Sequence, residues 1–146
     1  MSYAQIYFHI VFGTKDHLPL IAYAWEDEMY RYLGGIIAGQ KCVPIEINGM
    51  PDHVHILLRA SPVVALSDLV RDVKANSSKW ARRSKDPKFG WQRRFGAFSV
   101  SESKADTVQR YIRRQKIRHQ KQSFEEEYRE LLELHHIDFD GRFLWD

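Results

Sequence analysis

The sequence predicts an α+β domain, in which a four-stranded antiparallel sheet carries helices on one face. Four short segments rich in aromatic and β-branched residues predict the strands, and stretches with apolar residues at helical spacing predict the helices. The order of these elements is β-α-β-β-α-β. At 146 residues, 44% of them hydrophobic, the chain can bury a core, so we expect residues 1–146 to form one domain.

The first half of the chain is expected to hold three strands and one helix. The helix is indicated where Trp25, Met29 and Leu33 recur at helical spacing. Asn48-Gly49 is a turn signal between the second and third strands. We expect the strands over residues 3–12, 42–47 and 53–59, and the helix over residues 24–38.

The second half of the chain is expected to add a short strand and three helices. Ser103 with Asp106, and Ser123 with Glu126, have the spacing of a capping box, in which a serine oxygen accepts a hydrogen bond from the first helical turn. We expect the strand over residues 96–101 and the helices over residues 67–83, 104–120 and 123–134.

This order of elements is the ferredoxin-like or RRM-like arrangement, to which a C-terminal catalytic helix and a further tail helix would be added. RNA-recognition modules and several metal-dependent enzymes use the same topology, so the fold does not define the function. The single cysteine, Cys42, excludes an intrachain disulfide and a cysteine-cluster zinc site. The N-terminus lacks a signal-peptide pattern and no apolar run is long enough to span a membrane, so we expect a cytoplasmic protein.

The net charge of +3 hides a strong asymmetry along the chain. Residues 71–122 contain 16 Lys and Arg against four Asp and Glu, whereas residues 123–146 contain two Arg against eight Asp and Glu. A basic region with aromatic residues among its charges favours a polyanionic partner such as nucleic acid. The alternative is a solvated helix face, which is the usual explanation of a run of charges.

A pair of histidines lies at the start of the third predicted strand. Because side chains alternate along a strand, His53 and His55 would point to one face and Val54 to the other. Two imidazoles on one face could hold a single cation, and imidazole also suits proton transfer near neutral pH. Alternatively, both are hydrogen-bonded strand histidines, and Asp52 is either the partner of an imidazole or a turn residue after Pro51.

Tyr111 and Gln115 are four residues apart on a predicted helix and would share a face. Tyr111 is either a core residue with its hydroxyl at the surface or a nucleophile beside a metal-binding amide. A nucleophilic tyrosine needs help from a cation or a base, because its usual pKa is about 10. Basic neighbours that could hold phosphates and favour a phenolate are Arg110, Arg113, Arg114, Lys116 and Arg118.

A third candidate region, residues 79–95, interleaves basic and aromatic side chains. Proteins that bind single strands use this combination, because bases stack on the rings and phosphates pair with the cations. Alternatively, Trp80 and Phe95 belong to the core and the charges only solvate a loop.

Together these motifs resemble a known family. His53-Val54-His55 is similar to the HUH motif, and Tyr111 with Gln115 resembles the catalytic-helix signature of single-tyrosine HUH transposases. The resemblance extends in order through residues 9–15, 91–101 and 123–128, and so spans nearly the whole chain. The chain therefore resembles transposases of the single-strand insertion-sequence family, which are related to the REP-associated tyrosine transposases.

The resemblance implies a catalytic domain in which His53 and His55 bind a divalent cation, Mg²⁺ or Mn²⁺, with Gln115 as the third ligand. Tyr111 would attack single-stranded DNA with hairpin ends, forming a 5′-phosphotyrosine and freeing a 3′-hydroxyl. Many family members are dimers, so we expect a homodimer with active sites shared between subunits. We expect DNA contacts from Lys79, Arg82, Arg83, Arg93, Arg94, Arg110, Arg113, Arg114 and Arg118.

Other functions are compatible with the same residues. One is a ferredoxin-like nucleic-acid-binding protein, or a domesticated relative that processes hairpins without transposition. Another is a metal-dependent hydrolase that uses the histidines and a water molecule. Only the transposase forms a covalent protein–DNA adduct. His119, four residues beyond Gln115, is expected at the surface, with a position near the cation or the phosphate as the alternative.

Overall fold

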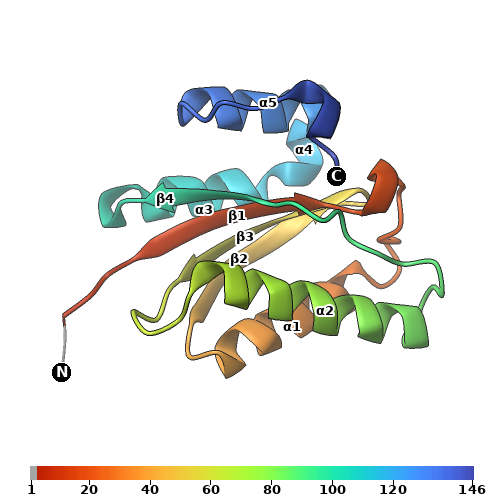
Figure 1. Ribbon diagram of the computed structural model, residues 1–146, viewed down its shortest axis with the longest axis horizontal. Helices are drawn as coiled ribbons and strands as arrows, with labels where there is room; N and C mark the ends of the chain where they lie inside the picture. The colour runs from red at the N-terminus through yellow and green to blue at the C-terminus, as the bar shows by residue number, and fades with distance from the viewer. Residues whose placement is uncertain (1–2) are drawn as a thin grey trace.

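The computed structural model describes residues 3–146, which form a four-stranded antiparallel sheet with helices on both faces (Figure 1). Each strand is antiparallel to its neighbours, and the order across the sheet is β2-β3-β1-β4. This order confirms the predicted ferredoxin-like arrangement. The strands are β1 (Tyr7–Gly13), β2 (Val43–Met50), β3 (His53–Arg59) and β4 (Gly96–Val100).

The helices divide between the two faces of the sheet. The lower face in Figure 1 is covered by α1 (Glu26–Gly39) and α2 (Leu66–Ser84). The upper face is covered by the C-terminal helices, which are α3 (Ala105–Arg113), α4 (Gln115–Arg118) and α5 (Phe124–Leu134). In the described part of the chain, no helix combines the length and the hydropathy that a membrane span needs.

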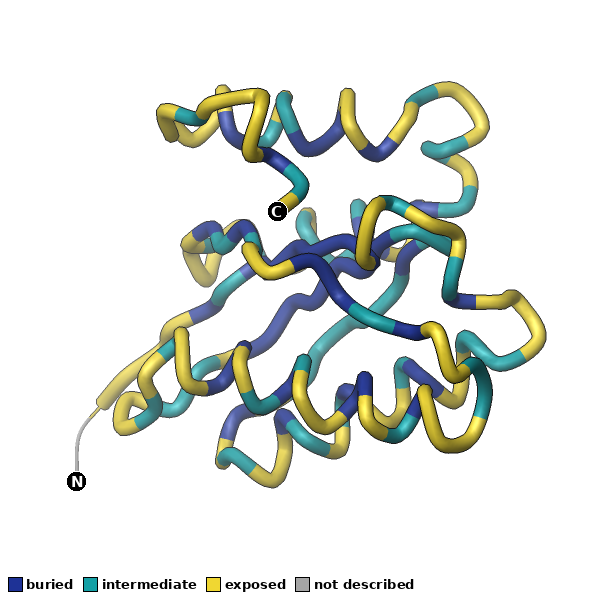
Figure 2. The backbone as a smooth tube through the Cα atoms, turned by 45° about the vertical axis from the view of Figure 1, so that its right-hand side comes forward, coloured by how far each residue is buried: buried dark blue, intermediate teal, exposed yellow. Residues whose placement is uncertain are grey.

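Both faces of the central strands are buried, as Figure 2 shows for β1 and β3. Ile10 and Phe12 of β1 point toward α1 and α2, where they join the largest hydrophobic cluster. Val11 points the other way and packs under α5 with Phe124. Because side chains alternate along a strand, every second residue of β1 and β3 therefore faces the C-terminal helices.

The turn between β2 and β3 differs from the prediction. Asn48 and Gly49 lie inside β2, paired with His55 and Val54, and the chain turns at Pro51-Asp52 instead. A Cβ atom at position 49 would collide with the backbone oxygen of His53, so glycine is needed there for close strand approach and not for a turn.

The helix predicted over residues 104–120 is broken in two. α3 ends at Arg113, and Asn48 of β2 donates its side-chain amide to the freed carbonyls of Ile112 (3.0 Å) and Arg113 (3.2 Å). The predicted cap at Ser103 is wrong, because α3 begins at Ala105 without a side-chain cap. The break lets α4 turn away from α3, and α5 then crosses back over the sheet (Figure 1).

The cap predicted for the tail helix is confirmed. The Ser123 oxygen accepts a hydrogen bond from the backbone amide of Glu126 at 3.2 Å, and α5 begins at Phe124. Phe124, Tyr128 and Leu132 are buried on the side of α5 that faces the sheet. This packing fixes α5 above the first residues of β3.

Candidate metal and tyrosine site

His53 and His55 lie on the upper face of β3, under the C-terminal helices. Both side chains are fully buried, and Val54 between them points into the opposite core. The pleat of the strand therefore presents two imidazoles to one side, as their spacing predicts.

Two further side chains join this pair from α5 and from the end of α4. Glu127 Oε1 lies 3.0 Å from His55 Nε2, 3.0 Å from His119 Nε2 and 3.5 Å from His53 Nε2. His119, expected at the surface, is almost buried, with 5% of its side chain exposed. One potential ligand atom from each of the four residues fits within a span of 4.8 Å. We call these four residues the His–Glu cluster.

Gln115 completes the surroundings of the cluster. Its side-chain oxygen lies 3.1 Å from His53 Nε2 and 2.9 Å from His119 Nε2, and its amide donates to Glu127 Oε2 at 2.8 Å. Gln115 is fully buried at the start of α4. Because the helix breaks between α3 and α4, the Gln115 side chain lies against His53 and His119.

Two neighbours fix the orientation of the strand imidazoles. Asp52 lies 2.7 Å from His53 Nδ1, and His9 Nε2 of β1 lies 2.8 Å from His55 Nδ1. In metal sites the nitrogen that does not bind the ion usually donates to such a partner, which fixes the tautomer and leaves Nε2 for the metal. Both Nε2 atoms point toward the cluster, so the arrangement fits this pattern.

The charges in the cluster are set by opposing effects. Burial favours neutral Glu127, but the surrounding histidines outweigh it and hold the pKa of Glu127 far below its usual value. Burial lowers the pKa of His55. For His53, burial is outweighed by hydrogen bonds to Asp52 and Glu127, so its pKa is raised. The cluster therefore holds a buried carboxylate that attracts positive charge.

Tyr111 on α3 reaches the same carboxylate. Its hydroxyl donates a hydrogen bond to Glu127 Oε2, and its ring lies 4.9 Å from the Arg118 guanidinium carbon. Burial and the negative charge of Glu127 raise the pKa of Tyr111 above its usual value. As it stands, the hydroxyl is therefore held in its protonated form.

The donor set fits a divalent cation. It combines imidazole nitrogens with carboxylate and amide oxygens, and such mixed sites suit Mn²⁺ or, with weaker nitrogen binding, Mg²⁺. His53 and His55 are already oriented by Asp52 and His9. The residues present could therefore hold the ion that the HUH resemblance implies.

A cavity of 410 Å³ opens beside Tyr111. Three cations line it, namely Arg114, Arg118 and Lys121. The first two are among the predicted DNA contacts. A phosphate group in this cavity would lie between basic side chains and the tyrosine hydroxyl.

The other predicted DNA contacts do not gather at this site. Arg110 and Arg113 are exposed on α3, where Arg113 pairs with Glu46 of β2 at 2.8 Å. The remaining five residues lie on α2 and the segment before β4, and are Lys79, Arg82, Arg83, Arg93 and Arg94. Because α2 covers the lower face of the sheet, the predicted contacts form at least two separate surfaces (Figure 1).

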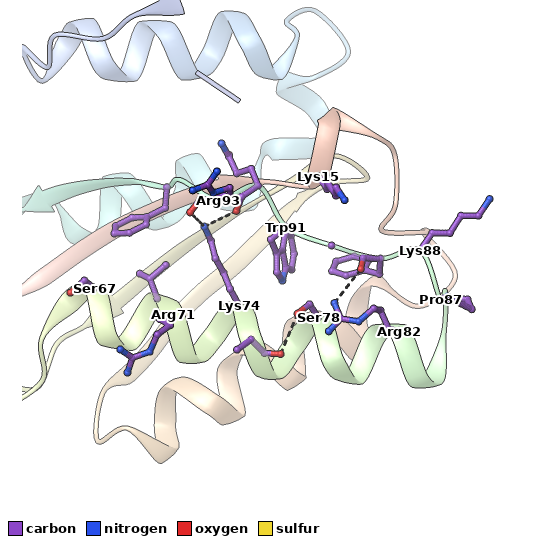
Figure 3. A pocket seen from close by; sticks show the side chains of 16 residues that line it. Lys15, Ser67, Arg71, Lys74, Ser78, Arg82, Pro87, Lys88, Trp91 and Arg93 are labelled. Carbon is purple, nitrogen blue, oxygen red and sulfur yellow. Dashed lines mark hydrogen bonds between the residues drawn. The ribbon is translucent and has the colours of Figure 1, made fainter. Parts of the chain in front are cut away.

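The second surface includes a groove of 850 Å³ between α2 and residues 87–95 (Figure 3). In the part of the chain that the structure describes, every charged side chain that lines this groove is basic. Lys74 holds its wall together by donating to the carbonyls of Gln92, Arg93 and Arg94 at 2.8 to 3.1 Å. The six cations of this basic groove are Lys15, Arg71, Lys74, Arg82, Lys88 and Arg93.

The aromatic residues of this region are buried in the lower core or partly buried against it. Trp91 is buried and its indole nitrogen donates to Ser77 at 2.9 Å. Trp80 stacks on Tyr32 with ring centroids 5.0 Å apart. Trp80 and Phe95 are partly buried and pack against the lower core, and Phe95 also lines the basic groove.

Glu127 and His9 belong to none of the motifs that the sequence identifies as a site. Glu127 carries a detectable signal, because it lies three residues after Phe124 and one before Tyr128, on the apolar side of α5. His9 alternates with the buried residues Tyr7 and Val11 on the upper face of β1. In both cases a polar residue on a buried face indicates a partner across the interface.

Comparison with known proteins gives a consistent result. The model of a family described as transposase IS200 like matches residues 2–115. The ISDra2 transposase TnpA of Deinococcus radiodurans is 30% identical over 121 residues, which cover 76% of this chain and 84% of that protein.

Two solved structures have a similar fold. A chain from Deinococcus radiodurans R1 assigned to the transposases superposes with a TM-score of 0.64 at 24% identity, covering 78% of this chain and 93% of that one. A REP-associated tyrosine transposase bound to a REP hairpin superposes with a TM-score of 0.62 at 13% identity, covering 82% of this chain and 72% of that one. At these identities the two structures show a shared fold.

Proposed function

Because this chain belongs to the IS200-like family of HUH-class tyrosine transposases, we propose that it nicks and rejoins single-stranded DNA through Tyr111. The single observation that carries this proposal is the meeting of Tyr111, Gln115 and the His–Glu cluster in one buried site. These groups come from separate elements of the fold, and a purely structural role for the histidines does not account for a tyrosine hydroxyl at the same carboxylate.

The proposed reaction is a phosphoryl transfer. The Tyr111 oxygen forms a bond to phosphorus while the bond to the 3′-oxygen breaks. The Tyr111 hydroxyl gives up its proton and the departing 3′-oxygen takes one, so that the strand leaves as a 3′-hydroxyl and protons balance. The tyrosine then carries the 5′-phosphate of the other strand, and a second 3′-hydroxyl can reverse the step without ATP. Arg114 and Arg118 line the cavity beside Tyr111, where they could hold the phosphate during both steps.

Metal assistance is part of the proposal. A divalent cation at His53, His55 and Gln115 would polarise a phosphoryl oxygen and neutralise charge that develops on the phosphate. The orientation of both histidines by Asp52 and His9 supports this role, because it directs their Nε2 atoms toward Glu127 and Gln115, where the ion would lie.

The single-stranded DNA is proposed to contact two basic surfaces, the cavity beside Tyr111 and the basic groove. The cavity beside Tyr111 would hold the phosphate that is cut, and the basic groove would hold a neighbouring part of the DNA. The similar REP-associated transposase is bound to a hairpin, which supports a hairpin-ended single strand as the partner. Since six cations line the basic groove and its aromatic rings pack largely against the core, we expect phosphate contacts to dominate the affinity and make it salt-dependent.

A covalent adduct tests the proposal directly. We expect hairpin-ended single-stranded DNA, incubated with the protein and Mn²⁺, to give a slowly migrating species on a denaturing gel. A 5′-phosphotyrosine retains the strand downstream of the cut, so a 3′-end label should shift and a 5′-end label should not. Cleavage without an adduct would favour the metal-dependent hydrolase, and binding without cleavage would favour the nucleic-acid-binding module.

The expected homodimer with shared sites is tested by mixing inactive variants. Within one chain Tyr111 already contacts Glu127 of the His–Glu cluster, which favours a site complete in each copy. A mixture of Tyr111→Phe with the double variant His53→Ala/His55→Ala is therefore expected to stay inactive. Recovery of adduct formation would instead mean that the histidines of one copy work with the tyrosine of another.

A further inference from the structure

We propose that Glu127 of the tail helix is itself a ligand of the divalent cation, and that cation binding and release of the Tyr111 hydroxyl are coupled through this carboxylate. The inference rests on the proposed function, since it assumes a cation at His53 and His55. It goes further by adding a negatively charged ligand from α5 and by connecting that ligand to the nucleophile.

The position of Glu127 Oε1 is the first argument. This oxygen lies where three imidazoles converge, 3.0 Å from His55 and His119 and 3.5 Å from His53. The two 3.0 Å distances suit hydrogen bonds in which Nε2 of His55 and Nε2 of His119 donate to the carboxylate oxygen. A cation would take the place of these protons, and the nearest available anion to neutralise it is Glu127.

The burial of Glu127 is the second argument. Only 1% of its side chain is exposed, and its full charge is balanced by the histidines and by Arg118, whose Nε lies 3.4 Å from Oε2. A buried carboxylate without a partner would cost several kcal/mol. A cation held at the same point by the histidines would supply the positive charge that a buried carboxylate needs, so burial favours ligation by Glu127 over its withdrawal.

The second oxygen supplies the coupling. Oε2 accepts hydrogen bonds from the Tyr111 hydroxyl and from the Gln115 amide. The two oxygens belong to one rigid carboxylate, so moving Oε1 aside to admit an ion also moves Oε2. We expect this movement to weaken the bond to Tyr111 and to free its hydroxyl for the phosphate in the adjoining cavity, which Tyr111 also lines.

Calorimetric titration of the protein with Mn²⁺ alone, without DNA, tests ligation by Glu127. Glu127→Gln should weaken Mn²⁺ binding by at least about tenfold, because a charged ligand is removed. Glu133→Gln is the matched control, since it removes the same charge from an exposed position of the same helix and should change nothing. Equal or tighter binding by Glu127→Gln would overturn the inference, because the carboxylate would then compete with the ion.

The coupling has its own readout in the same titration. Tyr111→Phe should tighten Mn²⁺ binding by about two- to tenfold. The variant lacks the hydrogen bond from Tyr111 to Glu127, so no such bond has to break when the ion binds. In the Glu127→Gln background the same substitution should have no further effect. Weaker binding by Tyr111→Phe, or an equal gain in both backgrounds, would contradict the coupling.

A measurement on the unmodified protein guards against loss of folding in the variants. Anomalous scattering from crystals soaked in Mn²⁺ should locate the ion with a Glu127 oxygen at bonding distance. An ion held by His53 and His55 with Glu127 turned away would overturn the inference and leave the proposed function intact. Failure of the unmodified protein to bind Mn²⁺ at all would instead contradict the proposed metal assistance.

Discussion

Tyr111→Phe is expected to abolish the covalent protein–DNA adduct and to lower the rate of strand cleavage by at least about a thousandfold, because no other group supplies the attacking oxygen. The substitution removes one hydroxyl and its hydrogen bond to Glu127, and leaves the ring between Arg118 and His9. The adduct assay with 3′-labelled hairpin DNA measures the effect.

DNA binding provides the control for this variant. The cations beside Tyr111 and those of the basic groove remain, and phosphate contacts supply most of the affinity, so affinity for the same hairpin should stay within about a factor of three. Adduct formation that survives in Tyr111→Phe would assign the nucleophile to another residue. Cleavage that survives without an adduct would favour attack by water.

The double variant His53→Ala/His55→Ala should stop nicking while salt-sensitive DNA binding persists. A bound cation contributes several kcal/mol to a phosphoryl transfer, and about 1.4 kcal/mol is a factor of ten in rate, so we expect the nicking rate to fall by about a thousandfold. Binding depends on the Lys and Arg that contact phosphates, and these do not change. Filter binding over a range of salt concentrations, run beside the nicking assay, separates the two effects.

The matched comparison is Arg93→Ala/Arg94→Ala, at exposed positions before β4. This variant should weaken DNA binding. It should also make the plot of the logarithm of the binding constant against the logarithm of the salt concentration shallower, by about one unit of slope for each phosphate that an arginine no longer neutralises. Because the histidine variant deprives Glu127 of two partners, its folding should be verified by circular dichroism at the assay temperature. An equal decrease in binding and nicking in the histidine variant would contradict the proposed division of roles.

The local elements follow from the sequence because their causes are local. β3 occupies the predicted residues 53–59, since its apolar run and the preceding Pro51-Asp52 determine it without distant contacts. The Ser123 cap of α5 likewise depends on residues three positions apart. The prediction is wrong where distant contacts decide, as at Gly49, whose small size serves the pairing of β2 with β3.

By itself, the sequence determined the type and order of the elements, the shared face of His53 and His55, and the candidate nucleophile Tyr111. These features depend on alternation along a strand and on motif spacing, which involve only residues close together in the sequence. The tertiary structure alone decided that Glu127 and His119 join the histidines. The place of Glu127 on the apolar side of α5 indicates a partner but does not identify it. The partner is decided where α5 crosses the sheet, and that crossing depends on the break after Arg113 and on the packing of Phe124 and Tyr128. Side chains 72 residues apart meet only through such packing.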